Sequence, residues 1–135
     1  MTIARRFVPQ RDLQKTGFTP SLRHLVAEVP GLHAVAFCDE EGEVIDYHSY
    51  LDPYETRVAG AMLGVLLSAV VREAPRLVHG GIRDLLLETD EHVLFARPTA
   101  AGYYLAGVLA RGSVLGKLFS ELDNAEARIM AEAGI

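Results

Sequence analysis

The chain has 135 residues, half of them hydrophobic, and a formal net charge of −5. This length suits a single domain with one core. The hydrophobic fraction excludes a disordered chain, and the acidic balance argues against nucleic acid as the main partner. The single Cys38 excludes an internal disulfide, and no signal-peptide pattern follows Met1, so we expect a cytoplasmic protein.

The first 17 residues show no sustained hydrophobic period and carry an excess of basic side chains. We therefore predict a flexible basic arm over residues 1–17, ahead of a single domain over residues 18–135. Such an arm is either a solvated tail or a docking segment for an acidic partner.

The hydrophobic periodicity predicts an α+β sandwich, in which a five-stranded antiparallel sheet carries helices on both faces. The expected order is helix, strand, strand, long helix, strand, strand, strand, helix. The expected bounds are 19–29, 32–38, 43–49, 52–74, 82–88, 92–97, 103–110 and a final helix that follows Ser113.

The first two strands form a predicted hairpin around the turn at 39–42. Our preferred register places a glycine bulge in this turn and sets Phe37 opposite Ile45. A register shifted by one residue would instead bring His33 and His48 together as a metal pair. The bulged register gives the better apolar face, so we expect no metal site here.

The long helix is the element around which the others are expected to pack. Asp52 and Pro53 form a capped start, and the residue before a proline is pushed out of the helical region, which predicts an end at Ala74. Residues 58–71 are all apolar or small, and a helix without a polar face must be covered on all sides. This run is shorter than the roughly 20 residues that cross a bilayer, so we expect no membrane span.

Gly60, Gly64 and Ser68 lie four residues apart, which places them on one face of this helix. A glycine costs up to about 1 kcal/mol relative to alanine in a helix interior, so this line indicates a close backbone contact. The contact is made either with the chain's own sheet or with the same helix of a second copy. In the second case, Gly64→Leu would give a monomer or an aggregate.

No pattern in the chain predicts catalysis. The segment around Gly116 and Lys117 lacks the first glycine and the Ser or Thr of a phosphate-binding loop, and no nucleophile elbow surrounds a serine. The acidic turn at 39–43 lacks the ligand spacing of a calcium loop. We therefore expect a protein that is not an enzyme and that carries no cofactor and no metal.

The order of elements and several short phrases resemble the Roadblock (dynein light-chain) family, and within it a bacterial, MglB-like member. The resemblance covers about residues 19–133. The phrases that carry it are Pro30–Phe37, the Asp39–Gly42 turn, Asp52 at the start of an Ala/Leu/Gly-rich helix, Gly102–Ala106 and Leu115–Gly116.

The resemblance implies a homodimer in which the long helix pairs with its mate and the third strand pairs with its mate to extend the sheet. It assigns the missing cover of the helix to a second copy. It also implies a non-catalytic signalling module that binds and regulates, or scaffolds, a small Ras-like GTPase. The expected dimer interface consists of Thr56, Gly60, Leu63, Gly64, Leu67, Ser68, Val71, Ile82, Asp84 and Leu86.

The alternative is a small-molecule sensor domain built on a PAS-, GAF- or profilin-like sheet. Such a domain needs a closed cavity of roughly 300 Å³ or more, and a solid core would argue against it. The residues available to line the cavity are Tyr47, Tyr50, Tyr54, Tyr103 and Tyr104.

Overall fold

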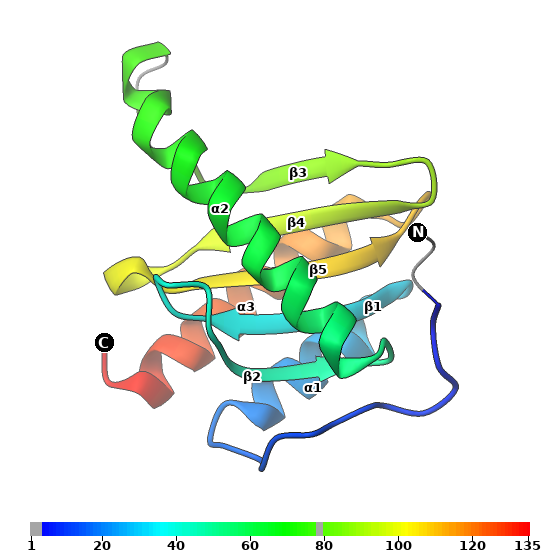
Figure 1. Ribbon diagram of the computed structural model, residues 1–135. Helices are drawn as coiled ribbons and strands as arrows, with labels where there is room; N and C mark the ends of the chain where they lie inside the picture. The colour runs from blue at the N-terminus through cyan, green and yellow to red at the C-terminus, as the bar shows by residue number, and fades with distance from the viewer. Residues whose placement is uncertain (1–3, 78–79) are drawn as a thin grey trace.

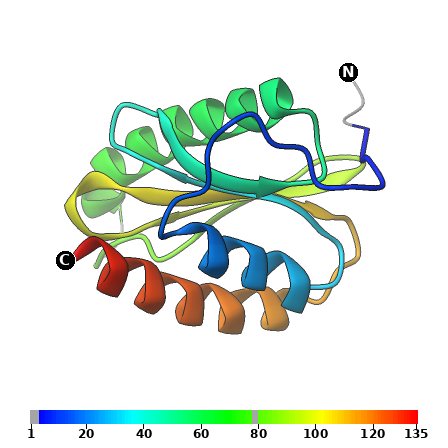
Figure 2. The same ribbon diagram turned by 90° about the horizontal axis from the view of Figure 1, so that it is seen from below.

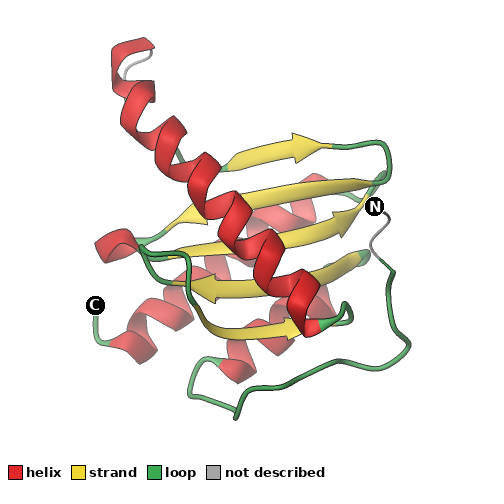
Figure 3. Cartoon of the chain, viewed as in Figure 1, coloured by secondary structure: helices red, strands yellow, loops and turns green. Residues whose placement is uncertain are grey.

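The computed structural model describes residues 4–77 and 80–135. The five strands form one antiparallel sheet in the order β2-β1-β5-β4-β3, which confirms the predicted fold class (Figures 1 and 3). The elements are α1 (Thr19–Glu28), β1 (Leu32–Cys38), β2 (Val44–Ser49), α2 (Pro53–Leu77), β3 (Leu85–Glu88), β4 (His92–Pro98), the short 3₁₀ turn η1 (Ala100–Gly102), β5 (Tyr104–Ala110) and α3 (Leu115–Ala133).

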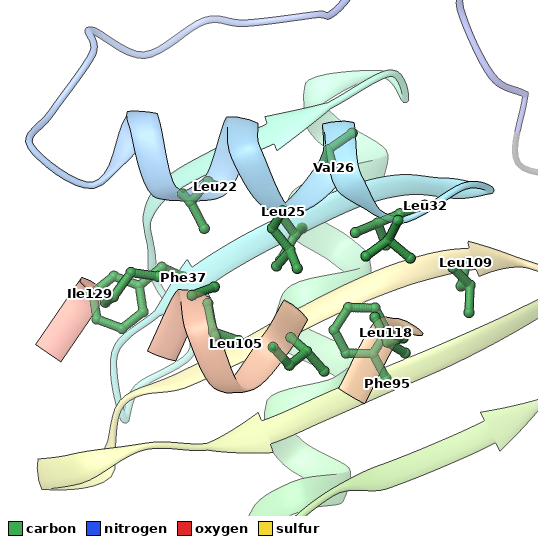
Figure 4. Packing of buried hydrophobic residues seen from close by; sticks show 14 of the residues in the cluster. Leu22, Leu25, Val26, Leu32, Phe37, Phe95, Leu105, Leu109, Leu118 and Ile129 are labelled. Atoms are coloured by element: carbon green, nitrogen blue, oxygen red, sulfur yellow. The ribbon is translucent and has the colours of Figure 1, made fainter. Parts of the chain in front are cut away.

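The sheet separates two hydrophobic layers (Figure 2). Helices α1 and α3 cover one face, where Phe37 and Phe95 of the sheet pack among the helix leucines, as the close view in Figure 4 shows. Helix α2 covers the other face, where the sheet presents small side chains such as Ala34 and Ala106. The small side chains let α2 approach the strands closely, as the sequence predicts for this face of β1.

Helix α2 ends at Leu77, so the predicted end at Ala74 is wrong. Pro75 lies inside the last turn and is exposed. A proline in a helix removes one backbone donor, and the carbonyl that this donor would have reached, on Val71, can be solvated at the exposed end of the helix. The proline therefore costs little here, and the helix continues past it.

The predicted Phe37–Ile45 register of the first hairpin is also wrong. Phe37 pairs with Asp46, and Cys38 pairs with Val44, so Ile45 is the extra residue of a bulge within β2. The bulge lies in the strand because Ile45 then packs against the α1/α3 layer, while Asp46 faces α1. The turn itself has the predicted glycine bulge, because Gly42 has a φ of 86° and its amide donates to the Asp39 carbonyl, and the Cys38–Val44 pair keeps the predicted register. The bulge at Ile45 is a second one that the sequence reasoning missed, and it moves the later side chains of β2 to the opposite face from the one predicted.

The rejected His33–His48 pair is not formed either. His33 lies beside His92 of β4, with 5.7 Å between the ring centroids. Burial lowers the pKa of His33, and the nearby charges of Arg5 and His92 lower it further. Within the described residues, no group of three His, Cys, Asp or Glu side chains could hold a metal ion.

Residues 4–17 pass along the outer side of β2 and around α1 (dark blue in Figure 1). The Arg6 and Gln10 amides donate to the carbonyls of Tyr50 and Ser49, over 2.6 and 2.8 Å. The Arg11 guanidinium donates to the buried Asp46 carboxylate over 2.6 Å. These contacts hold residues 4–17 against the domain, which the absence of a hydrophobic period did not predict. The division of the chain at Gly17 stays a prediction.

Asp12 links this segment to the start of α2. Its carboxylate accepts hydrogen bonds from both terminal nitrogens of Arg57, at 2.7 and 2.9 Å, and from the Tyr47 hydroxyl at 2.6 Å. The hydrogen bonds from Arg57 and Tyr47 lower the pKa of Asp12 to about 2.

The stabilising effect of Asp12 should therefore depend on pH. An unfolded aspartate titrates near about 3.9, so the contribution is fully present above about pH 4 and is lost as the pH falls toward the folded pKa. We expect wild type to be more stable than Asp12→Asn above pH 4, with the difference shrinking toward pH 2. Urea denaturation across this range measures it. Glu41→Gln, in an exposed turn, is the control and should show no such trend.

Candidate protein-interaction surface

Helix α2 has one face on the sheet and one apolar face in solvent. On the inner face, Leu63 and Leu67 are buried, and the Thr56 hydroxyl lies 2.7 Å from the Ser49 hydroxyl. On the outer face the exposed fractions of the large apolar side chains range from 37% to 72%. We call this the outer apolar face; it consists of Tyr54, Val58, Met62, Val65, Leu66 and Val71.

The C-terminal part of α2 projects past β3, beyond the edge of the sheet (Figure 1). Val71, in this part, is 44% exposed. An apolar patch that continues from the domain onto a projecting helix typically marks a contact with another chain. Helix α2 is thus covered by the sheet on one side and exposed on the other.

Strand β3 is an edge strand beside this projecting helix. It pairs with β4 along one side, and no described strand pairs with its other side. The strand begins at Leu85, three residues later than the predicted Ile82. An open edge presents unpaired backbone donors and acceptors, which can accept a strand from another chain.

In the glycine line of α2, Gly60 and Gly64 face the chain's own sheet, whereas Ser68 is exposed. A Cβ added to Gly60 would lie 3.3 Å from the Cys38 sulfur, and one added to Gly64 would lie only 2.1 Å from the Tyr104 hydroxyl oxygen. That hydroxyl donates a hydrogen bond to the Gly60 carbonyl over 2.8 Å. Of the two contacts considered for this line, the structure supports the one with the sheet.

The structure places the residues of the predicted dimer interface in three groups. The first group consists of α2 residues that are buried against the sheet: Thr56, Gly60, Leu63, Gly64 and Leu67. Those that lie exposed on α2 are Ser68 and Val71. Those near the sheet edge, all half-buried, are Ile82, Asp84 and Leu86. A second copy could reach the last two groups, whereas the first group is already covered by the chain's own strands.

Asp84 is engaged by a buried arginine that the sequence reasoning missed. Arg97 of β4 is 1% exposed and donates to both carboxylate oxygens of Asp84, at 2.8 and 3.0 Å, and to Asp123 of α3 at 2.6 Å. Burial disfavours the charge on Arg97, but the two carboxylates outweigh burial and raise its pKa. The cluster ties the segment before β3 to α3 and thereby fixes the edge strand.

No protein-family model matches the sequence, and no curated protein matches it. Among solved structures, a Roadblock/LC7 domain from Streptomyces avermitilis is similar to this chain, with a TM-score of 0.78, 22% identity, and coverage of 85% of this chain and 96% of that one. The chain has the Roadblock/LC7 fold. The predicted resemblance is therefore confirmed at the level of the fold.

Two further structures share this fold. MglB from Myxococcus xanthus gives a TM-score of 0.78 at 12% identity, covering 90% of this chain and 98% of that one. A structure described as MglB with a tetrameric arrangement gives a TM-score of 0.74 at 17% identity, covering 98% and 99%. Each spans nearly the whole of this Roadblock/LC7-fold chain, its N-terminal segment included in the second case.

Within the described part of the chain, one helix, Pro53–Arg76, is long and apolar enough to cross a membrane. Length and composition alone are weak support for a span, because core helices of soluble proteins satisfy the same test. In this Roadblock/LC7 fold the inner face of the helix packs on the sheet. Its outer face is exposed to solvent.

Proposed function

We propose that the chain forms a homodimer through the outer apolar face of α2 and the free edge of β3. The observation that carries the proposal is the exposure of large apolar side chains along α2, next to a strand edge that pairs with no described strand. A second copy of the chain offers the same two surfaces. Related by a two-fold axis, the helices can cover each other while the two β3 strands pair.

The dimensions support a stable contact. Helix α2 has 25 residues and is about 37 Å long at 1.5 Å per residue. A standard interface buries about 800 Å² on each partner. Six partly exposed large side chains and a strand edge can supply an area of that order. The tetrameric arrangement named for one MglB structure is a further reason to expect assembly on this fold.

The proposed role of this dimer is that of a cytoplasmic, non-catalytic regulatory scaffold that binds a small Ras-like GTPase. Two observations support it: the shared fold with MglB, and the family resemblance set out above, whose members regulate or scaffold such GTPases. The chemistry of the described residues agrees with a binding role, since burial raises the pKa of the lone Cys38 thiol to about 12 and leaves it a poor nucleophile.

The dimer is tested by placing a charge on the outer apolar face. Val65 is 72% exposed, so Val65→Glu should leave the monomer folded while burying a carboxylate in any helix–helix contact. We expect wild type to have the mass of a dimer by light scattering and Val65→Glu that of a monomer, with unchanged circular dichroism. Ala127→Glu, on the exposed side of α3, is the matched control and should stay dimeric. A wild-type monomer, or a dimer that tolerates Val65→Glu, contradicts the proposal.

The GTPase is tested with wild type and Val65→Glu. Immobilised wild type and Val65→Glu are mixed with native cytosol that contains either GDP or a non-hydrolysable GTP analogue. The proposal expects a small GTPase to be retained by wild type in one nucleotide state more than in the other. Retention of no GTPase, or equal retention in both states, counts against a regulatory role.

The sensor alternative receives less support. The five tyrosines do not converge on one cavity: Tyr54 is exposed on α2, and Tyr47 and Tyr104 are buried in the core. Tyr50 and part of Tyr47 line one hollow, and Tyr103 and part of Tyr104 line another, and both hollows open to solvent. These tyrosines therefore do not form an enclosed site between α2 and the sheet.

A further inference from the structure

A hollow lies between the N-terminal segment, α1 and the β2 edge, on the side of the sheet opposite α2. It has a volume of about 560 Å³ and opens to solvent. Small-molecule sites commonly have volumes of about 300–1,000 Å³. The backbone bonds from Arg6 and Gln10 hold the N-terminal segment at one wall of the hollow, and α1 forms the opposite wall.

The walls of this hollow carry a concentration of positive charge. Four cationic side chains line it, and among its described lining residues none is Asp or Glu. The cationic residues are Arg5, Arg11, Lys15 and Arg23. In a chain with a net charge of −5, a surface of this kind is not a consequence of overall composition.

Three of the four cations are not neutralised within the fold. Arg11 pairs with Asp46, and its terminal nitrogens also donate to the carbonyls of Tyr47 and Gln14. Arg5, Lys15 and Arg23 form no ion pair with any described residue. Arg11 therefore has a structural role, and the other three charges are available to a ligand.

The imidazole of His48 reports the same positive potential. Burial lowers the pKa of His48, and the charges of Arg23 and Arg11 lower it further, against a smaller opposite effect of Asp46. The ring sits at the wall of the hollow, edge-on to Tyr50 with 6.0 Å between the centroids. The Arg5 guanidinium lies 4.8 Å from the Tyr50 ring centroid.

The hollow also has an apolar part. Ala27 and Pro30, both exposed, line it where α1 leads into β1, and the Tyr50 ring adds an aromatic surface. An inorganic ion would use the cations alone. A ligand with both a multiply charged group and an apolar or aromatic group would use both parts.

From this arrangement we propose that the hollow binds a small organic polyphosphate of the nucleotide class. Its phosphates contact Arg5, Lys15 and Arg23, and its organic part lies against Tyr50 and the apolar residues. Guanidinium groups match phosphate oxygens in a bidentate geometry, and charge-assisted bonds of this type are stronger than neutral ones. Because the site is on the α1 side, it is independent of the proposed dimer surface on α2.

The test is calorimetric titration of the purified full-length protein with ATP, pyrophosphate and a hexaglutamate peptide. We expect ATP to bind most tightly and its affinity to fall as salt is raised. Arg23→Glu should weaken ATP binding by about tenfold or more, since a charge-assisted hydrogen bond contributes about 1.5–3 kcal/mol. Arg128→Glu, on the exposed side of α3, carries the same charge change and should leave the affinity within about twofold.

A second readout locates the site. ATP should shift the NMR signals of the His48 ring in wild type and not in Arg23→Glu, while the exposed side of α3 stays unaffected in both. The proposal is overturned if ATP fails to bind at millimolar concentration, or if Arg23→Glu and Arg128→Glu weaken it equally. Pyrophosphate binding as tightly as ATP overturns the role of the apolar part, and tighter binding of hexaglutamate overturns the small-molecule class.

Discussion

Replacing Gly64 with alanine should lower the free energy of unfolding by about 2 kcal/mol, although alanine is the better helix former by about 1 kcal/mol. The new Cβ would lie 2.1 Å from the hydroxyl oxygen and 2.7 Å from the adjoining ring carbon of Tyr104. Tyr104 is 4% exposed and has no room to retreat without losing its bond to the Gly60 carbonyl. Overpacking of this kind costs about 1–3 kcal/mol, and a lost buried hydrogen bond adds to it.

Urea denaturation of wild type and variant measures this loss. Gly116→Ala is the control, because a Cβ at Gly116 meets no atom within 4 Å and should leave the stability unchanged or slightly higher. Tyr104→Phe removes the clashing oxygen, so the double variant should recover part of the loss. Gly64→Leu should prevent folding altogether, which differs from the folded monomer expected of an interface mutation. An unchanged stability of Gly64→Ala would show that α2 does not pack this closely.

The sequence predicted the strands well because their signal is local. Apolar residues alternate or run continuously over β1, β4 and β5, and turn residues separate them, so each strand was found within a residue or two of its observed bounds. Strand β3 was predicted three residues too long at its start. Ile82 extends the apolar pattern toward the start of the segment, but residues 82–84 do not join the ladder with β4.

Hydrophobic periodicity alone could not predict which face of α2 lies on the sheet. Its exposed and buried faces are both apolar, so Val58 and Leu63 give the same signal although one is 47% and the other 0% exposed. The residue that decides the matter is Tyr104, which lies 40 positions after Gly64 in the chain and whose ring fills the space that the glycine leaves. Such a contact depends on how β5 is placed in the sheet, which no local pattern encodes.

The N-terminal segment escaped prediction for a related reason. Its order comes from single side chains that pair across the fold, such as Arg11 with Asp46 and Asp12 with Arg57. Isolated charges of this kind look the same in a sequence whether they are solvated or paired. The proposed anion site depends on that order, so it too could only be found in three dimensions.

Replacing Arg97 with methionine should cost about 3 kcal/mol of stability, even though methionine has a similar shape and is less costly to bury. The Asp84 side chain is only 12% exposed, and it would lose the two hydrogen bonds that compensate its charge. Removing one partner of a buried ion pair typically costs about 3–5 kcal/mol. We expect a value at the lower end, since the Asp123 side chain is 50% exposed and can be solvated.

A double variant that removes both partners of the buried ion pair provides the decisive comparison. Exchanging both partners of a buried pair for apolar residues is often neutral, so Arg97→Met with Asp84→Leu should recover most of the loss seen in Arg97→Met alone. Arg72→Met, at an exposed pair with Glu73, should cost less than about 1 kcal/mol in the same denaturation assay. Hydrogen exchange of β3 amides should accelerate more than that of β1 amides in Arg97→Met, because the cluster anchors the edge strand. Equal acceleration in both strands would mean that Arg97 supports the core in general and not the proposed dimer edge.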